Sequence, residues 1–204
     1  MSLRVDVTRG MSFTLKPKVT STAKGERAMY DQGGLVLLVK QFKDEAVDEA
    51  GFYERLTELI TTELGCSRAS LWLYSNNLLN EIEAIDLYDS NLNQHFKGAK
   101  LSEEDFGPYF ESMRQFGSID AGNAFVHPAT SCFTELYFEP NNIFSLLDIG
   151  IRQNGQLVGV FCCEHVGDYM HWNDQQKQFL EQAGKLIAFA LKSKLMERFS
   201  ALFS

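Results

Sequence analysis

Residues 162–165 place the side chains best suited to chemistry next to one another: Cys162, Cys163, Glu164 and His165. A thiol beside an imidazole can act as a nucleophile–base pair, and thiolate, imidazole and carboxylate groups all bind zinc. Successive side chains of a strand point to opposite faces, so only Cys163 and His165 would share a face. Two ligands do not make a zinc site, and no third group is in view to orient the base. We therefore interpret these cysteines as small buried apolar side chains, with thiol catalysis as the alternative.

The other potentially reactive residues are isolated in the chain. Cys66 and Cys132 form no C-x-x-C pair with the others, and we expect all four cysteines to be reduced. His127 precedes Pro128 and could ligate haem, but a histidine at such a position is typically an ordinary surface residue. We expect neither a metal nor a cofactor, and leave open an unknown small-molecule ligand.

The chemistry of this segment depends on the hairpin that carries it. Asn154-Gly155 lies between two apolar runs, and this dipeptide favours a type I′ turn of two residues. Such a turn pairs Gln153 with Gln156 and Arg152 with Leu157, and an unbroken register then fixes both faces. One face is apolar and is expected to pack on helices: Leu147, Ile149, Ile151, Val158, Val160 and Cys162. The other is mixed: Phe144, Leu146, Asp148, Gly150, Gly159, Phe161, Cys163 and His165.

The mixed face predicts a ligand pocket. A carboxylate in an apolar strand is costly when it is buried and unpaired, so Asp148 needs water, a partner or a ligand. The segment 127–138 reads as a short helix entered through Pro128, which would cover this face. The predicted pocket residues are Asp148, Leu146, Phe161, Cys163, Thr130, Phe133 and Tyr137. The alternative is a filled core that binds nothing.

The elements around the hairpin indicate an α+β domain. An apolar stripe predicts a helix over residues 48–64, and alternation predicts strands over 67–74 and 79–88. A helix with a kink near Pro108 is expected over 102–115. A closing helix is expected from Asn173 to about Phe199.

Composition excludes several classes of protein. The chain has 204 residues, a formal net charge of -8 and a hydrophobic fraction of 45%. This charge disfavours binding to nucleic acid or anionic lipid, and no apolar run is long enough to span a bilayer. We expect a cytoplasmic protein with an N-terminal arm or linker over 1–32, a domain over 33–196 and the end of a C-terminal signalling helix over 197–204.

Two stretches resemble the GAF domain family of bacterial signal-transduction sensors. "SLLDIGIRQNGQLVGVFCCEHVGDYMHWNDQQKQFLEQAGKLIAFAL" is similar to its second half, and "FYERLTELITTELGCSRASLWLY" to its first helix and strand. The resemblance implies an antiparallel sheet of five to six strands, with the N- and C-terminal helices on one face and a ligand pocket on the other. It also implies a regulatory role towards an output module, such as a histidine kinase or a diguanylate cyclase. The N-K-F-D-E pattern of the cyclic-nucleotide-binding members and a motif for covalent bilin attachment are both missing.

Three functions follow from these observations. The first is a non-catalytic sensor that binds a small molecule and acts through a homodimer formed by its N- and C-terminal helices, with an output domain in a longer chain or a partner. The second is a thiol-dependent enzyme of the free methionine sulfoxide reductase type. In that family the reactive cysteines lie in loops at the pocket mouth, whereas here Cys162 and Cys163 lie within a strand. The third is a dimerisation module without a ligand.

Overall fold

The computed structural model describes Tyr30 and residues 32–198. The expected arm over residues 1–32 and the last residue of the expected closing helix, Phe199, therefore lie almost entirely outside the described residues.

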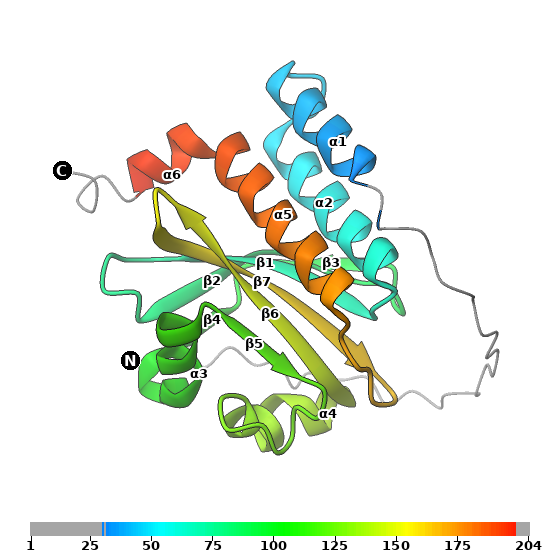
Figure 1. Cartoon of the computed structure of the whole chain (residues 1–204), viewed down its shortest axis with the longest axis vertical. Helices are drawn as coiled ribbons and strands as arrows, with labels where there is room; N and C mark the ends of the chain where they lie inside the picture. The colour runs from blue at the N-terminus through cyan, green and yellow to red at the C-terminus, as the bar shows by residue number, and fades with distance from the viewer. Residues whose placement is uncertain (1–29, 31, 199–204) are drawn as a thin grey trace.

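A twisted antiparallel sheet forms the centre of the molecule (Figure 1). Its strands follow the order β3-β2-β1-β7-β6-β5, and β4 pairs with β2. Their bounds are β1 Arg68–Tyr74, β2 Glu81–Asp89, β3 Gln94–Phe96, β4 Lys100–Ser102, β5 Ser118–Ala121, β6 Ile143–Gln153 and β7 Gln156–Val166. The short strands β3 and β4 raise the number of strands to seven, one more than the upper expectation.

Four helices lie on one side of the sheet (Figure 1). They are α1 Gly33–Lys43, α2 Glu49–Leu64, α5 Asp174–Ala190 and α6 Lys192–Arg198. The expected boundaries of α2 are confirmed, because Asp48 caps its first turn and Gly65 ends it in a left-handed conformation. α5 begins at the capping box formed by Asn173 and Gln176. No described helix has the length and apolar character that crossing a bilayer requires.

The opposite side of the sheet is covered by α3 Glu103–Phe116 and by a helical segment of three short pieces. These are η1 Ser131–Phe133, η2 Thr134–Phe138 in π-helical form, and α4 Glu139–Asn141. The expected kink in α3 is confirmed at Phe106, whose φ of -129° departs from the helix just before Pro108. We call residues 131–141 the covering segment.

The closing helix is not continuous, contrary to expectation. It ends at Ala190, and α6 continues in a different direction after Leu191 (Figure 1). The Lys43 ammonium donates a hydrogen bond of 2.7 Å to the Ala190 carbonyl and so satisfies an acceptor at the end of α5. The change of direction accompanies the burial of both Leu191 and Leu195.

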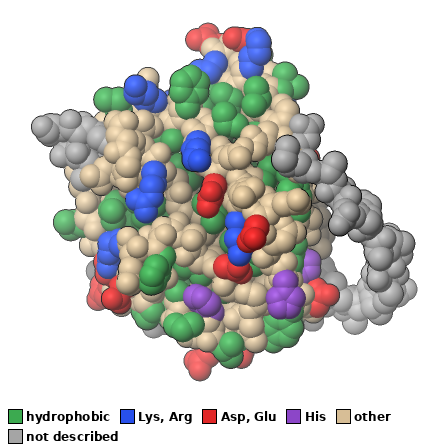
Figure 2. Space-filling view, viewed as in Figure 1, with side chains coloured by type: hydrophobic (Ala, Val, Ile, Leu, Met, Phe, Trp, Pro, Cys, Tyr) green, Lys and Arg blue, Asp and Glu red, His purple; other side chains and the backbone are tan. Residues whose placement is uncertain are grey.

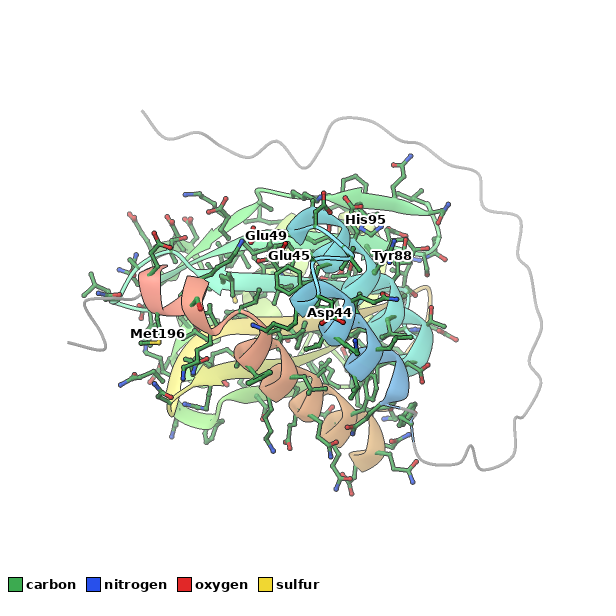
Figure 3. The ribbon with its side chains drawn as sticks, turned by 90° about the horizontal axis from the view of Figure 1, so that it is seen from above. Asp44, Glu45, Glu49, Tyr88, His95 and Met196 are labelled. Atoms are coloured by element: carbon green, nitrogen blue, oxygen red, sulfur yellow. The ribbon has the colours of Figure 1, made fainter. Side chains whose placement is uncertain are left out.

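The edge strand β3 is tied to α2 by His95. Its Nδ1 lies 2.9 Å from Asp86 Oδ2, and its Nε2 lies 3.3 Å from Glu58 Oε1 on α2. The His95 and Tyr88 rings lie side by side with a centroid separation of 4.8 Å (Figure 3). Burial opposes the charge of His95, but the hydrogen bond and charge of Asp86 outweigh it and raise the histidine pKa.

Candidate functional site

A β-bulge changes the faces expected for β7. The turn is as expected: Asn154 and Gly155 have φ of 51° and 82°, and Arg152 pairs with Leu157. The next pair, however, is Ile151 with Gly159, so Val158 is an extra residue on β7.

This one-residue shift turns the side chains of β7 beyond Val158 to the other face. Cys162, and not Phe161, is paired directly with Asp148. The placement of Phe161 and Cys163 beside Asp148 is therefore wrong, since Phe161 pairs with Ile149 and Cys163 with Leu147 on the face that carries α2 and α5. The bulge brings Cys162 and Glu164 to the Asp148 side instead.

Asp148 lies on the expected side of the sheet, away from the terminal helices. Its side chain is 1% exposed, and its Oδ2 accepts a hydrogen bond of 2.5 Å from the Tyr109 hydroxyl of α3. Its Oδ1 is buried and has no N–H or O–H donor. Burial raises the pKa of Asp148 to about 7, although the hydrogen bonds from Tyr109 and Cys162 favour its charged form.

Glu164 is the second buried carboxylate on this side. Its Oε2 accepts a hydrogen bond of 3.1 Å from the Tyr137 hydroxyl of the covering segment. The same oxygen lies 3.7 Å from Arg68 Nη1, while Arg68 Nε donates at 2.6 Å to Asp89. Burial raises the pKa of Glu164, opposed by the positive charge of Arg68.

Cys162 lies between the two carboxylates. Its thiol donates a hydrogen bond to Glu164 Oε1, with 3.9 Å between Sγ and the oxygen, and it also interacts with Asp148. Burial and then the charge of Asp148 raise its pKa well above that of a free thiol. Because the thiolate is the nucleophile, these surroundings keep the sulfur unreactive.

The covering segment closes the Asp148 side with aromatic side chains. Phe133 packs against Tyr109 at 5.4 Å between centroids and against Phe138 at 5.7 Å. All three residues are buried. Thr130, just before the segment, is fully buried, but its hydroxyl donates to the Ala124 carbonyl at 2.7 Å and so holds the loop. Leu146 is buried on the Asp148 side, beside Ala121 of β5.

The structure thus brings Asp148 and Leu146 together on one face of the sheet, with Phe133 and Tyr137 covering that face. Their binding of a ligand remains a prediction. Sequence reasoning missed four participants: Tyr109, Cys162, Glu164 and Arg68. Glu164 carried the same signal as Asp148, an ionisable residue within an apolar strand. The others depend on the bulge or on contacts between distant segments.

The remaining reactive residues have structural contacts. Cys163 lies on the helix side, hydrogen-bonded to Cys66, and burial raises its pKa well above that of a free thiol. His165 lies 2.8 Å from Asp168, and His127 Nδ1 accepts a hydrogen bond from the Ala129 amide. Within the described residues, no three His, Cys, Asp or Glu side chains form a group that could hold a metal ion.

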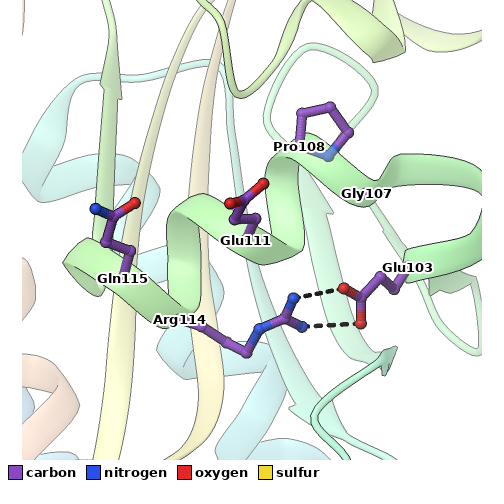
Figure 4. Close-up of a pocket in the computed structure, with 6 residues that line it drawn as sticks. All are labelled: Glu103, Gly107, Pro108, Glu111, Arg114 and Gln115. Carbon is purple, nitrogen blue, oxygen red and sulfur yellow. Dashed lines mark hydrogen bonds and ion pairs between the residues drawn. The ribbon is translucent and has the colours of Figure 1, made fainter.

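A hollow lies on the outer surface of α3 (Figure 4). It is lined by Glu103, Gly107, Pro108, Glu111, Arg114 and Gln115. Arg114 binds the Glu103 carboxylate through both terminal nitrogens, so its charge is already paired. The hollow is open to solvent and offers weaker grounds for a binding site than the Asp148 side.

Solved structures support the fold. The chromophore-binding domain of Stigmatella aurantiaca bacteriophytochrome is similar with a TM-score of 0.58 and 13% identity, over 78% of this chain and 59% of that one. This chain therefore spans less than two thirds of that domain. The GAF domain of a phosphoenolpyruvate-protein phosphotransferase from Coxiella burnetii has a TM-score of 0.54 and 16% identity, over 79% and 96% of the two chains.

A third similar structure is an enzyme. Free methionine-R-sulfoxide reductase from Neisseria meningitidis, solved with its substrate, has a TM-score of 0.56 and 15% identity, over 90% and 96% of the two chains. At these identities the likeness shows the fold alone. No curated protein gives a significant match. The GAF domain model matches residues 48–191, and the chain belongs to the GAF domain family.

Proposed function

We propose that this chain is a regulatory, non-catalytic sensor domain that binds a small molecule on the Asp148 side of its sheet. One observation carries the proposal: two buried carboxylates and a thiol face α3 and the covering segment, while the opposite face of the sheet packs on α2 and α5. Burying Asp148 and Glu164 costs free energy that apolar residues would avoid. Groups kept at such a cost are typical of a binding site.

Two hydrogen bonds support a route by which binding at this site would affect other parts of the protein. Tyr109 and Tyr137 connect the buried carboxylates to the two segments that cover them, so a ligand that changes these bonds would move the covering segments. Such movement would change the sheet and the helices on its other face, and thereby bias an output.

We further propose that the output acts through a homodimer formed by the N- and C-terminal helices. Val36 and Leu37 of α1 and Phe189 of α5 are exposed by 53%, 55% and 64%. Hydrophobic side chains gather where α1 lies, at the top of the space-filling view (Figure 2). Met196 of α6 is also exposed (Figure 3). The output domain, of the histidine kinase or diguanylate cyclase kind, belongs to a longer chain or a partner in the bacterial cytoplasm.

The experiment is thermal unfolding of the chain with a panel of metabolites and nucleotides that spans neutral, anionic and cationic compounds. A specific ligand should raise Tm of the native chain and lose most of its effect in Asp148→Asn. The matched control is Glu104→Gln, which neutralises an exposed carboxylate of α3. A panel in which no compound raises Tm would favour the dimerisation module without a ligand, and light scattering would then test the dimer.

The enzyme alternative rests on the similarity to the sulfoxide reductase. A reductase needs a thiol that ionises readily, whereas burial raises the pKa of Cys162, Cys163 and the half-buried Cys132. An assay with free methionine sulfoxide, thioredoxin and its reductase should give no turnover. Turnover that disappears in Cys132→Ala would replace the sensor proposal.

A further inference from the structure

The two buried carboxylates on the Asp148 side have the same kind of partner. Each accepts one hydroxyl from a segment that covers the sheet: Asp148 from Tyr109 of α3, and Glu164 from Tyr137 of the covering segment. A carboxylate has about four lone-pair sites, so one hydroxyl leaves much of its capacity unused, even with the weak thiol donor Cys162 and the contact of Arg68 with Glu164. In particular, Oδ1 of Asp148 is buried without an N–H or O–H donor.

The charges on this side do not balance. Among the described residues, Arg68 is the one cation in ion-pair contact with this group, and it is shared by Asp89 and Glu164. In the part of the chain that the structure describes, no ion pair reaches Asp148. Three carboxyl groups, those of Asp89, Asp148 and Glu164, therefore face the single guanidinium of Arg68. The Asp148 side would carry a net negative charge if all three were ionised. Such a site must take up protons or a cation.

Resting on the proposed sensor function, we propose that the ligand is a small organic cation, a primary ammonium or guanidinium compound, whose N–H groups replace the tyrosine hydroxyls at Asp148 and Glu164. Charge-assisted hydrogen bonds to a carboxylate are stronger than those from a neutral hydroxyl, so such a ligand can compete with both tyrosines. An anion would meet like charge at the same place.

The apolar side chains beside the two carboxylates favour an organic cation over a hydrated inorganic ion. Phe133, Phe138 and Leu146 are buried on this side and offer apolar surface to a carbon chain. Displacement of the hydroxyls also explains how binding would be transmitted, because Tyr109 and Tyr137 belong to the two elements that close the site. The ligand class and the movement thus follow from the same two hydrogen bonds.

The test uses the intact chain and four probes. Butylammonium, its neutral analogue 1-butanol and the anion butyrate are of similar size, and agmatine is a larger cation with both an ammonium and a guanidinium group. Calorimetry and thermal unfolding are run at pH 6 and pH 8 with equal ionic strength. At ten times the dissociation constant, a cation should raise Tm by roughly 3–6 °C. The neutral and anionic analogues should leave Tm unchanged.

Protonation adds a second readout. Asp148 faces Tyr109 of α3, Tyr74 of β1 and both Cys162 and Glu164 of β7. Because its pKa is about 7, Asp148 must lose its proton to bind the cation, so binding should be about tenfold tighter at pH 8 than at pH 6. Asp148→Asn should abolish this difference and most of the affinity, whereas the control Glu104→Gln should preserve both.

Tyr137→Phe tests whether the Tyr137 hydroxyl competes with the cation for Glu164 or has a structural role. It keeps the ring and removes the donor, so cation binding should tighten by roughly two- to tenfold if the hydroxyl competes with the ligand. Unchanged or weaker binding in this variant would contradict the inference. So would equal binding of butylammonium and 1-butanol, or binding that survives in both Asp148→Asn and Glu164→Gln.

The outcomes also distinguish the two proposals. A neutral or anionic compound from the metabolite panel that raises Tm only when Asp148 is present would refute the cation and preserve the sensor. An absence of binding by every compound, in the native chain and in Tyr137→Phe, would refute both.

Discussion

Replacing Asp148 by asparagine should change how the stability of the domain depends on pH. The burial that raises the pKa of Asp148 to about 7, from 3.8 in the unfolded chain, makes the folded state hold its proton more tightly. This contribution is fully present below pH 4 and is lost as pH rises towards and through 7. Asparagine does not titrate, so the variant lacks this part of the pH dependence.

The expected size follows from the two pKa values. Between pH 5 and pH 8 the proton on Asp148 contributes about 3 kcal/mol to the free energy of unfolding, and this amount is lost at the higher pH. The cost of fitting the amide beside Tyr109 is the same at both pH values and cancels. The stability of the asparagine variant should therefore rise by about 3 kcal/mol relative to that of the native chain between pH 5 and pH 8.

Urea unfolding of both proteins at the two pH values measures this double difference. Glu104→Gln, which neutralises an exposed carboxylate on α3, the helix that carries Tyr109, should show a much smaller change. A double difference below about 0.5 kcal/mol for Asp148→Asn would refute the argument, since Asp148 would then not be held in its protonated form by burial.

Three further results are expected. Gly159→Ala should destabilise the domain by roughly 2–4 kcal/mol in urea unfolding, because the new Cβ would lie 2.4 Å from the Trp72 carbonyl oxygen of β1. The control is Gly107→Ala, which has open space around its Cβ and should be neutral or slightly stabilising. Equal effects at both positions would contradict the close approach of β1 to Gly159. His95→Gln should lower stability more at pH 6 than at pH 8.5, by up to about 1 kcal/mol. Asp86 raises the pKa of His95, so the stabilising positive charge of His95 is lost as pH rises through this pKa. The same loss of stability at both pH values would count against this prediction. A thiol reagent at pH 8 should modify Cys132 alone in the folded chain and all four cysteines in urea, since the other three are buried. Rapid modification of a second cysteine in the folded chain would show that the sheet opens readily.

Local signals in the chain were sufficient for most of the secondary structure. Asp48 and Gly65 mark both ends of α2, and Asn173 marks the start of α5. Their signals succeed because a cap acts on backbone groups only a few residues away. The division of the sheet into a helix-covered face and an Asp148 face was also predictable, because alternation in β6 depends only on the pleat of that strand.

The end of the closing helix could not be predicted in this way. An apolar stripe continues through Leu191 and Leu195, and nothing in the neighbouring sequence indicates a break. The interruption goes with the burial of both leucines and with the bond from Lys43 on α1 to the Ala190 carbonyl. These contacts join residues that are far apart in the chain.

By itself, the sequence determined the Asn154-Gly155 turn, the caps of the main helices and the side of the sheet that carries Asp148. Only the tertiary structure decided which residues stand beside Asp148. The close approach of β1 to Gly159 accompanies a bulge at Val158, and this single extra residue exchanges Phe161 and Cys163 for Cys162 and Glu164. The turn fixes the pairing only as far as the register is unbroken, and packing against a third strand decides where it breaks.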